Sequence, residues 1–170
     1  FSRIEKYEQI SDNMEIEIAN YLEQVGNEHL SDETKDKTRV ILRQIGELES
    51  IGDSCFHLAR TLRRKRENCT DPFTDEQRHR ITQMMTLTDT SLSNMENLLE
   101  QDTPLTEDQV SYSHNLENEI NNYRNELKSR NLQDIDAGRY SYQLGVFYVD
   151  FICECEKLAD YVINIVETEE

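Results

Sequence analysis

YSYQLGVFYVDFICECEKLADYVINIV, residues 140–166, is the most apolar part of this chain. Apolar side chains surround most of its helical circumference, which is typical of a helix buried on all sides. Glu154, Glu156 and Asp160 nevertheless interrupt the apolar run. We therefore expect this segment to form the central helix of the fold, and we ask why a buried helix carries carboxylates.

The composition predicts an all-α protein. The chain has 170 residues, enough for one domain with a core, and contains only 5 Gly and 2 Pro. Both prolines lie in short polar breaks, CTDPFTD and DTPLT, and the long stretches between them are rich in Glu, Leu, Lys, Gln and Arg. These are strong helix formers, so few breakers and many formers together favour long helices.

Periodicity and capping signals predict five helices. Ser31 is an N-cap candidate, and Thr74 with Gln77 and Thr106 with Gln109 have the spacing of capping boxes. The predicted helices span residues 4–27, 32–68, 75–101, 107–131 and 137–166.

Two pairs of segments show an internal repeat. SDNMEIEIANYLEQ at 11–24 matches SHNLENEINNYRNE at 113–126, and ELESIGDSCFHLAR at 47–60 matches ECEKLADYVINIVE at 154–167. The first two helices therefore correspond to the last two. We expect a single domain, 1–170, with a partial first repeat of two helices at 1–68 and a complete second repeat of three helices at 74–168. By this interpretation a further helix precedes Phe1, and the chain is a fragment of a longer protein.

Acidic pairs recur at equivalent places in the two repeats. Glu49 and Asp53 are four residues apart, as are Glu156 and Asp160, so each pair shares one helix face. Like charges at this spacing destabilise a helix unless a cation or base lies between them. Oxygen ligands suit hard cations, and we predict a carboxylate metal site with divalent or ferric ions. Its further candidate ligands are Asp12, Glu15 and Glu117.

Two other interpretations of these carboxylates remain open. A chain with 35 acidic residues produces acidic pairs by chance, so the pairs also fit a metal-free helical scaffold for protein interaction. A carboxylate-bridged two-metal enzyme is the other alternative, although its typical Glu-x-x-His pairs are lacking around DSCFH and LARTLRRKRE. His57 fits a surface or edge position better than a ligand.

The net charge of −17 argues against nucleic-acid binding, because such a chain repels phosphate backbones. Basic residues nevertheless gather in RTLRRKR, residues 60–66. The run fits a solvated helix end that complements the helix dipole, or a contact with an acidic surface or anionic lipid. Its candidate partner-binding residues are Arg60, Arg63, Arg64, Lys65 and Arg66.

The cysteine pattern and hydropathy indicate a protein domain from a reducing compartment. Cys55, Cys69, Cys153 and Cys155 form no C-x-x-C pair and are expected to be reduced, which argues against a zinc–thiolate site. No run of about 20 apolar residues and no signal peptide is visible.

LESIGD at 48–53 and CEKLAD at 155–160 resemble the repeated E(D)xxxD motif of the PhoU family of phosphate regulators. YEQISDNMEIEI, at 7–18, is similar to the helix that precedes this motif. The resemblance covers most of the chain and implies tandem three-helix bundles of PhoU type, with metal on Glu49, Asp53, Glu156 and Asp160. Two positions depart from the family pattern. The motif arginine is Ser50 in one copy and Lys157 in the other, and His114 stands where the first repeat has Asp12, so two metal sites need not be equal.

YEQISDNMEIEIANYL and GELESIGDSC together resemble the PhoU-like cytoplasmic tail of bacterial sodium/phosphate cotransporters. This resemblance implies a regulatory domain, not an enzyme, that modulates phosphate uptake. Its partner would be the membrane domain of the same symporter, at the cytoplasmic face of the inner membrane, with the fragment itself soluble. A homodimer is a further arrangement that the sequence leaves open.

Overall fold

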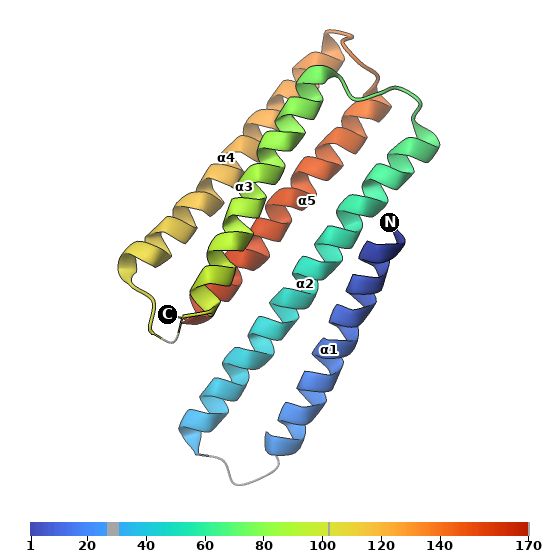
Figure 1. Cartoon of the computed structure of the whole chain (residues 1–170). Coiled ribbons are helices and arrows are strands. Elements are labelled where there is room, and N and C mark those ends of the chain that lie inside the picture. Colours follow the sequence, from blue (N-terminus) through green and yellow to red (C-terminus); the bar gives the residue numbers. More distant parts are fainter. Residues whose placement is uncertain (27–30, 102, 170) are drawn as a thin grey trace.

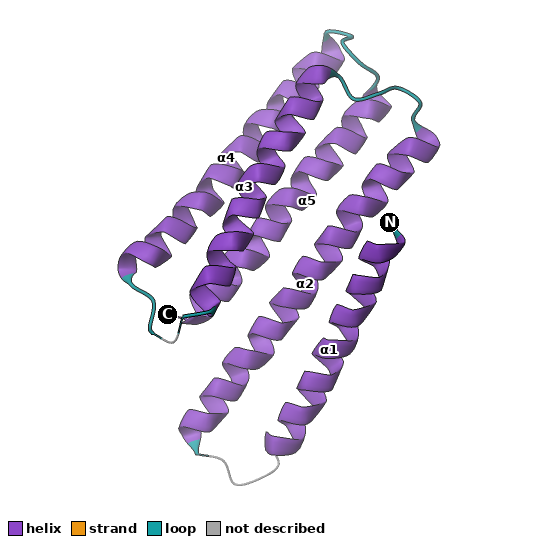
Figure 2. Ribbon diagram, in the orientation of Figure 1, coloured by secondary structure: helices purple, strands orange, loops and turns teal. Residues whose placement is uncertain are grey.

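A computed structural model describes residues 1–26, 31–101 and 103–169 and shows long helices joined by short loops (Figure 1). Figure 2 shows that these described residues contain helices and loops but no strand, which confirms the all-α prediction. The elements are α1 (Ser2–Gly26), α2 (Asp32–Asn68), α3 (Asp75–Leu99), α4 (Glu107–Asp136), α5 (Tyr142–Val166) and the 3-10 helix η1 (Glu167–Glu169).

The helices form one bundle around α5. Helix α5 packs against α2, α3 and α4, and α3 also packs against α4. Helix α1 lies at the outer edge and packs on α2 (Figure 1). Following the colours along the chain, α2 runs antiparallel to both α1 and α5, whereas α3 runs parallel to α5. The bundle therefore consists of a three-helix part, α3–α4–α5, with the α1–α2 pair attached through α2.

The predicted capping residues begin the helices as expected. Ser31 accepts a hydrogen bond from the backbone N–H of Thr34, at 3.2 Å, before α2. Thr74 and Thr106 each form a complete capping box, with Gln77 and Gln109 respectively. These boxes satisfy backbone donors that no intrahelical acceptor reaches.

The predicted boundary between the last two helices was wrong. Helix α4 continues to Asp136 rather than ending at 131, and α5 begins at Tyr142 rather than 137. Gly138, at φ 67°, ends α4: its N–H donates to Ile135 O and the N–H of Arg139 donates to Asp134 O. This is the Schellman arrangement, which favours glycine because an L side chain is strained at positive φ. Ser141 then caps α5.

Two other predicted bounds also differ. Helix α3 ends at Leu99 rather than 101, with Glu100 as its C-cap. Helix α1 begins at Ser2 rather than residue 4, and its predicted end at Asn27 lies outside the described residues.

Helix α5 is the central buried element, as its apolar composition predicts. It contributes more than half of the buried apolar side chains, including Tyr148, Phe151, Ile152 and Leu158. These residues join Met84 from α3, Ile120 and Leu127 from α4, and Ile51 from α2. Burial of such side chains provides the main driving force for packing the other helices around α5.

Helix α1 differs from the others because it has no buried residue. Its apolar side chains are only partly covered: Ile18, Leu22 and Val25 are half-buried, whereas Ile10, Met14 and Tyr21 are exposed. Helix α2 fully buries only Ile51 and Ser54, and its Ile41, Leu48 and Leu62 side chains are exposed.

The four cysteines are free thiols. Within the part of the chain that the structure describes, no helix combines the length and the apolar character needed to cross a bilayer.

Candidate metal centre

Three carboxylates from α1 and α2 converge on one point. Glu8 and Asp12, one turn apart on α1, meet Asp53 of α2, and one ligand oxygen from each lies within 4.8 Å of the other two. Gly52 allows this close approach, because a Cβ at that position would lie 3.2 Å from the Ser11 hydroxyl oxygen. The geometry brings two predicted ligands together, Asp12 and Asp53, and adds Glu8.

One oxygen of this group lacks a protein partner. Asp12 Oδ1 is inaccessible to solvent and has no hydrogen-bond partner. A buried carboxylate oxygen without a partner is costly, because it loses water and gains nothing in return. A cation held between Glu8, Asp12 and Asp53 would restore this lost interaction.

Glu49 and Glu15, which were also predicted as ligands, are not among the three carboxylates that converge, although Glu49 lies close enough to feel the charges of Asp53, Glu15 and Asp12. Burial raises the pKa of Glu49, and the charges of Asp53, Glu15 and Asp12 raise it further. The pKa of Glu8 is also raised, by partial desolvation and then by Asp12, Asp53 and Glu5, while His57 opposes this shift. Raised carboxyl pKa values indicate that the ionised forms are insufficiently compensated.

In the described part of the chain, this group has no direct ion pair with a basic side chain. Among the residues that the structure describes, no lysine, arginine or histidine nitrogen lies within 4.0 Å of a carboxylate oxygen of Glu8, Asp12, Glu15, Glu49 or Asp53. The donor set is purely carboxylate, which is the chemistry that Mg²⁺, Ca²⁺, Mn²⁺ and ferric iron accept. The first repeat therefore fits a hard cation.

The acidic group of the second repeat is partly compensated by a neighbouring arginine. Arg124 of α4 places a guanidinium nitrogen 2.8 Å from Glu156 Oε1, and the Asn121 amide donates to Glu117. Burial raises the pKa values of Glu156 and Asp160, and Arg124 partly opposes both shifts. Glu156, Asp160 and Glu117 thus lie near one another, and Arg124 compensates part of their charge.

The repeat alignment identifies the residue responsible for this difference. The position that matches Arg124, 102 residues earlier, is Leu22. The first repeat therefore lacks the guanidinium that the second repeat supplies. The sequence suggested unequal sites because His114 stands opposite Asp12, whereas the larger electrostatic difference comes from Leu22 and Arg124.

Sequence reasoning missed Glu8. Its spacing could have identified it as a candidate ligand: Glu8 lies four residues before Asp12, so the two share one face of α1 with Glu15. His57 was interpreted as a surface or edge residue. It is half-buried, and its Nδ1 lies 3.6 Å from Glu154 Oε1 across the α2–α5 contact.

Some basic side chains of the 60–66 run contact other residues of the chain, and others are exposed to solvent. The Arg63 side chain binds Glu67 at 2.9 Å and lies over the Phe1 ring, and Arg60 lies over Phe56. Lys65 donates to the backbone oxygen of Asp71. Arg64 and Arg66 are exposed without ion-pair partners among the described residues. The two exposed arginines are thus the part of the run free to meet a partner.

No protein-family model, curated protein or solved structure matches this chain. The functional argument therefore depends on the geometry of the acidic groups and on the motifs of the sequence.

Proposed function

We propose that this chain is a non-enzymatic, PhoU-like regulatory domain of a bacterial sodium-dependent phosphate transporter. In this proposal it works at the cytoplasmic face of the inner membrane and modulates phosphate uptake by contacting the membrane domain. The observation that carries the proposal is the carboxylate group of Glu8, Asp12 and Asp53, which has no direct ion pair among the described residues and whose Asp53 is the last residue of LESIGD. The resemblance of LESIGD and CEKLAD to the repeated motif of PhoU phosphate regulators supports a role in phosphate transport.

The carboxylate group supports an ion-dependent regulatory role. Glu8 and Asp12 from α1 and Asp53 from α2 would hold a divalent or ferric cation between two helices. When bound, this cation supplies positive charge that a phosphate oxygen can share. The residues of the chain would then connect ion status to the packing of α1 on α2, because the ligands come from both helices.

The basic run supports docking on an acidic or lipid-bordered surface. Arg64 and Arg66 project from the C-terminal turns of α2, where cations are favoured by the helix dipole. Anionic lipids at a cytoplasmic membrane surface attract such clusters. Docking through this end would leave the carboxylate group available for its cation.

The second repeat favours a metal-free scaffold as the alternative function. Arg124 already pairs with Glu156, so this acidic group depends less on a bound ion than the group of the first repeat does. If the first repeat also proves indifferent to cations, the chain is better described as an interaction scaffold. The carboxylate-bridged enzyme remains the third possibility, and metal analysis with an oxygen-consumption assay distinguishes it.

The docking proposal is tested by phosphate uptake in cells that carry the intact transporter. Changing Arg63, Arg64 and Arg66 to glutamate should alter uptake and reduce membrane association of the domain. The matched control changes Lys35, Lys37 and Arg39, three basic residues at the other end of α2, to glutamate. Equal uptake and equal membrane association in both variants would contradict docking through the 60–66 run.

A further inference from the structure

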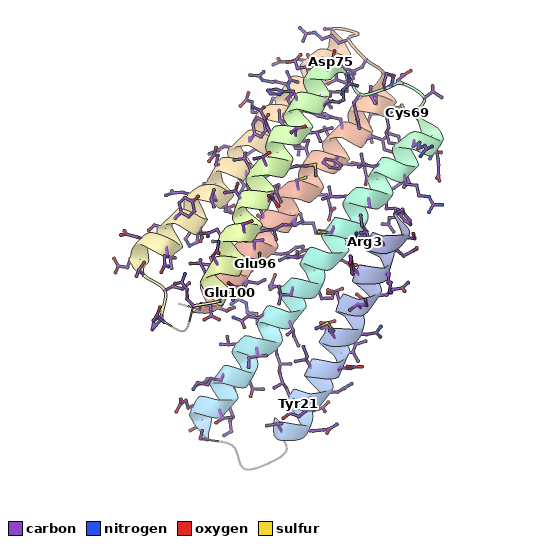
Figure 3. The ribbon with its side chains drawn as sticks, viewed as in Figure 1. Arg3, Tyr21, Cys69, Asp75, Glu96 and Glu100 are labelled. Atoms are coloured by element: carbon purple, nitrogen blue, oxygen red, sulfur yellow. The ribbon has the colours of Figure 1, made fainter. Side chains whose placement is uncertain are left out.

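A groove of about 770 Å³ lies on the surface between α3 and α4. Asp75, the first residue of α3, and Glu100, its C-cap, mark the two ends of that helix in Figure 3, and the groove runs beside its first half. A volume of this size is typical of small-molecule sites, which are usually lined by apolar side chains. Here, except for Leu87, the lining residues carry polar groups, so the groove suits a polar ligand.

Four polar residues on the α4 side of the groove are identical in the repeat alignment, which pairs Asn115 with Asn13, Glu119 with Glu17, Asn122 with Asn20 and Tyr123 with Tyr21. Asn115, Glu119 and Asn122 are exposed, so they add little to the packing of the core. Exposed polar and aromatic residues that stay the same indicate binding rather than packing. A ligand therefore explains these identities better than the fold does.

The hydroxyl groups of the groove can serve a ligand only as hydrogen-bond acceptors. Thr82 donates to Arg78 O and Thr86 donates to Thr82 O, both at 2.9 Å. Tyr123 donates to Gln83 Oε1 at 2.6 Å. Because a hydroxyl has a single hydrogen, these three oxygens retain only lone pairs for another partner.

Amide and carboxylate groups add further acceptors and negative charge. Asn118 donates to His114 O at 2.9 Å, which leaves its carbonyl oxygen and one N–H for a ligand. Glu119 has no ion pair among the described residues. Glu126 pairs with Arg130 at 2.6 Å through one oxygen, so its other oxygen can accept from a ligand. In a chain of net charge −17, this acceptor-rich groove favours cations and repels anions.

We propose that this groove binds a linear polyamine of the spermidine type. The ammonium groups of the ligand donate to Glu119, Glu126 and the neutral oxygens between them, and its alkyl segments lie over Leu87 and the Tyr123 ring. An ammonium group only donates hydrogen bonds, which matches a site whose oxygens accept them. A cation over the Tyr123 ring gains a further electrostatic attraction.

The spacing of the two carboxylates selects the length of the ligand. Glu119 and Glu126 are seven residues apart on α4, so they share one face and lie about 10 Å apart along the helix axis. The terminal nitrogens of extended spermidine are roughly 11 Å apart, as its bond lengths require. Both ends of the molecule can therefore meet a carboxylate at once. A single metal ion cannot, because it holds carboxylate oxygens at roughly 2–2.6 Å.

Isothermal titration calorimetry of the whole chain with spermidine tests the site, in about 0.15 M NaCl so that weak nonspecific attraction is screened. Binding to the wild-type chain should be saturable. Glu119→Gln should weaken it by about three- to fivefold, because one ammonium group loses its carboxylate. The matched control, Glu96→Gln, makes the same charge change at an exposed position of α3 outside the groove and should leave Kd unchanged.

A second pair of variants fills the groove without changing its charge. Thr86→Phe with Asn122→Phe should weaken binding by about tenfold or more, because the two rings occupy the space of the ligand. Ser93→Phe with Asn97→Phe, at two exposed positions of α3 outside the groove, is the control and should bind as the wild-type chain does. Circular dichroism checks that every variant is folded.

The groove shares no residue with the carboxylate group of Glu8, Asp12 and Asp53, so Asp53→Asn should bind spermidine as tightly as the wild-type chain. The proposal is overturned if spermidine does not bind, if the groove variants bind as tightly as their controls, or if Asp53→Asn abolishes binding. The last outcome would place spermidine at the carboxylate group of α1 and α2. The first two would leave the metal site proposed there unaffected.

Discussion

His57 and Glu154 meet across the α2–α5 contact, with Nδ1 3.6 Å from Oε1. The reciprocal contact is also present, because the Asn164 amide donates to Glu47 at 3.1 Å. In the repeat alignment Glu154 corresponds to Glu47 and Asn164 to His57. Each contact is therefore the counterpart of the other, as expected if two copies of one unit pack antiparallel about a local twofold axis between α2 and α5.

The carboxylate group of the first repeat predicts cation-dependent stability. Mg²⁺, Ca²⁺ or Mn²⁺ at about ten times its Kd should stabilise the fold by about 1.4 kcal/mol, which raises Tm by about 3–5 °C. Asp53→Asn should abolish this rise and slightly increase Tm without the cation, because it relieves repulsion. Asp160→Asn, the same change in the second repeat, is the control and should retain the rise. Thermal unfolding followed by circular dichroism provides the measurement, and an equal response in both variants would refute the assignment.

The Arg124–Glu156 pair predicts that the second repeat can be made to resemble the first. Arg124→Leu copies Leu22 and should cost about 1–3 kcal/mol, because it leaves the half-buried Glu156 unpaired. Divalent cations should recover part of this loss. Arg130→Leu, which removes an exposed pair with Glu126, should cost less and show no such recovery. Urea denaturation with and without cation tests both, and a recovery in neither variant would contradict the prediction.

The unequal burial of the repeats predicts unequal effects of equivalent core substitutions. Leu116→Ala should destabilise by about 2–4 kcal/mol, because it removes a side chain that is 6% exposed. Met14→Ala, at the corresponding position, should cost less than about 1 kcal/mol, because Met14 is largely exposed. Urea denaturation of the isolated chain measures both values. Similar losses would mean that the exposed side chain of Met14 is covered in solution.

The raised carboxyl pKa values predict the direction of the pH dependence. Burial and neighbouring acids raise the pKa of Glu49 above its usual 4.5. A raised folded-state pKa gives a stability contribution that is full below the unfolded pKa and is lost as pH rises through the folded value. Glu49→Gln should therefore stabilise the cation-free chain at neutral pH, and this advantage should shrink on acidification through the raised pKa. Denaturation of both proteins across that range tests the sign, and an advantage that grows on acidification would contradict it.

The sequence predicts the fold well because its main signals are local or strongly periodic. Ser31, Thr74 and Thr106 mark helix starts through hydrogen bonds within three residues. The apolar character of residues 140–166 predicts the central position of α5. The α4–α5 boundary failed because helical periodicity continues through Ile135, and the Schellman turn at Gly138 was not recognised as the stop signal.

The site was predicted less completely, because it depends on contacts between helices. Spacing on one helix identifies Glu49 with Asp53, and it also pairs Glu8 with Asp12. It does not predict that Gly52 brings α1 close enough for Asp12 to meet Asp53. Nor does it predict that Arg124 of α4 reaches Glu156 of α5, because that ion pair joins residues far apart in the chain.

Because the described helix α1 has no buried side chain, we expect it to unfold locally more often than the rest of the bundle. An element held by few buried contacts opens locally at a lower free energy than the whole domain unfolds. Amide hydrogens of α1 should therefore exchange with deuterium well before those of α5, whose opening requires disruption of the core. A cation bound by Glu8, Asp12 and Asp53 would link α1 to α2 and should therefore slow this exchange along α1.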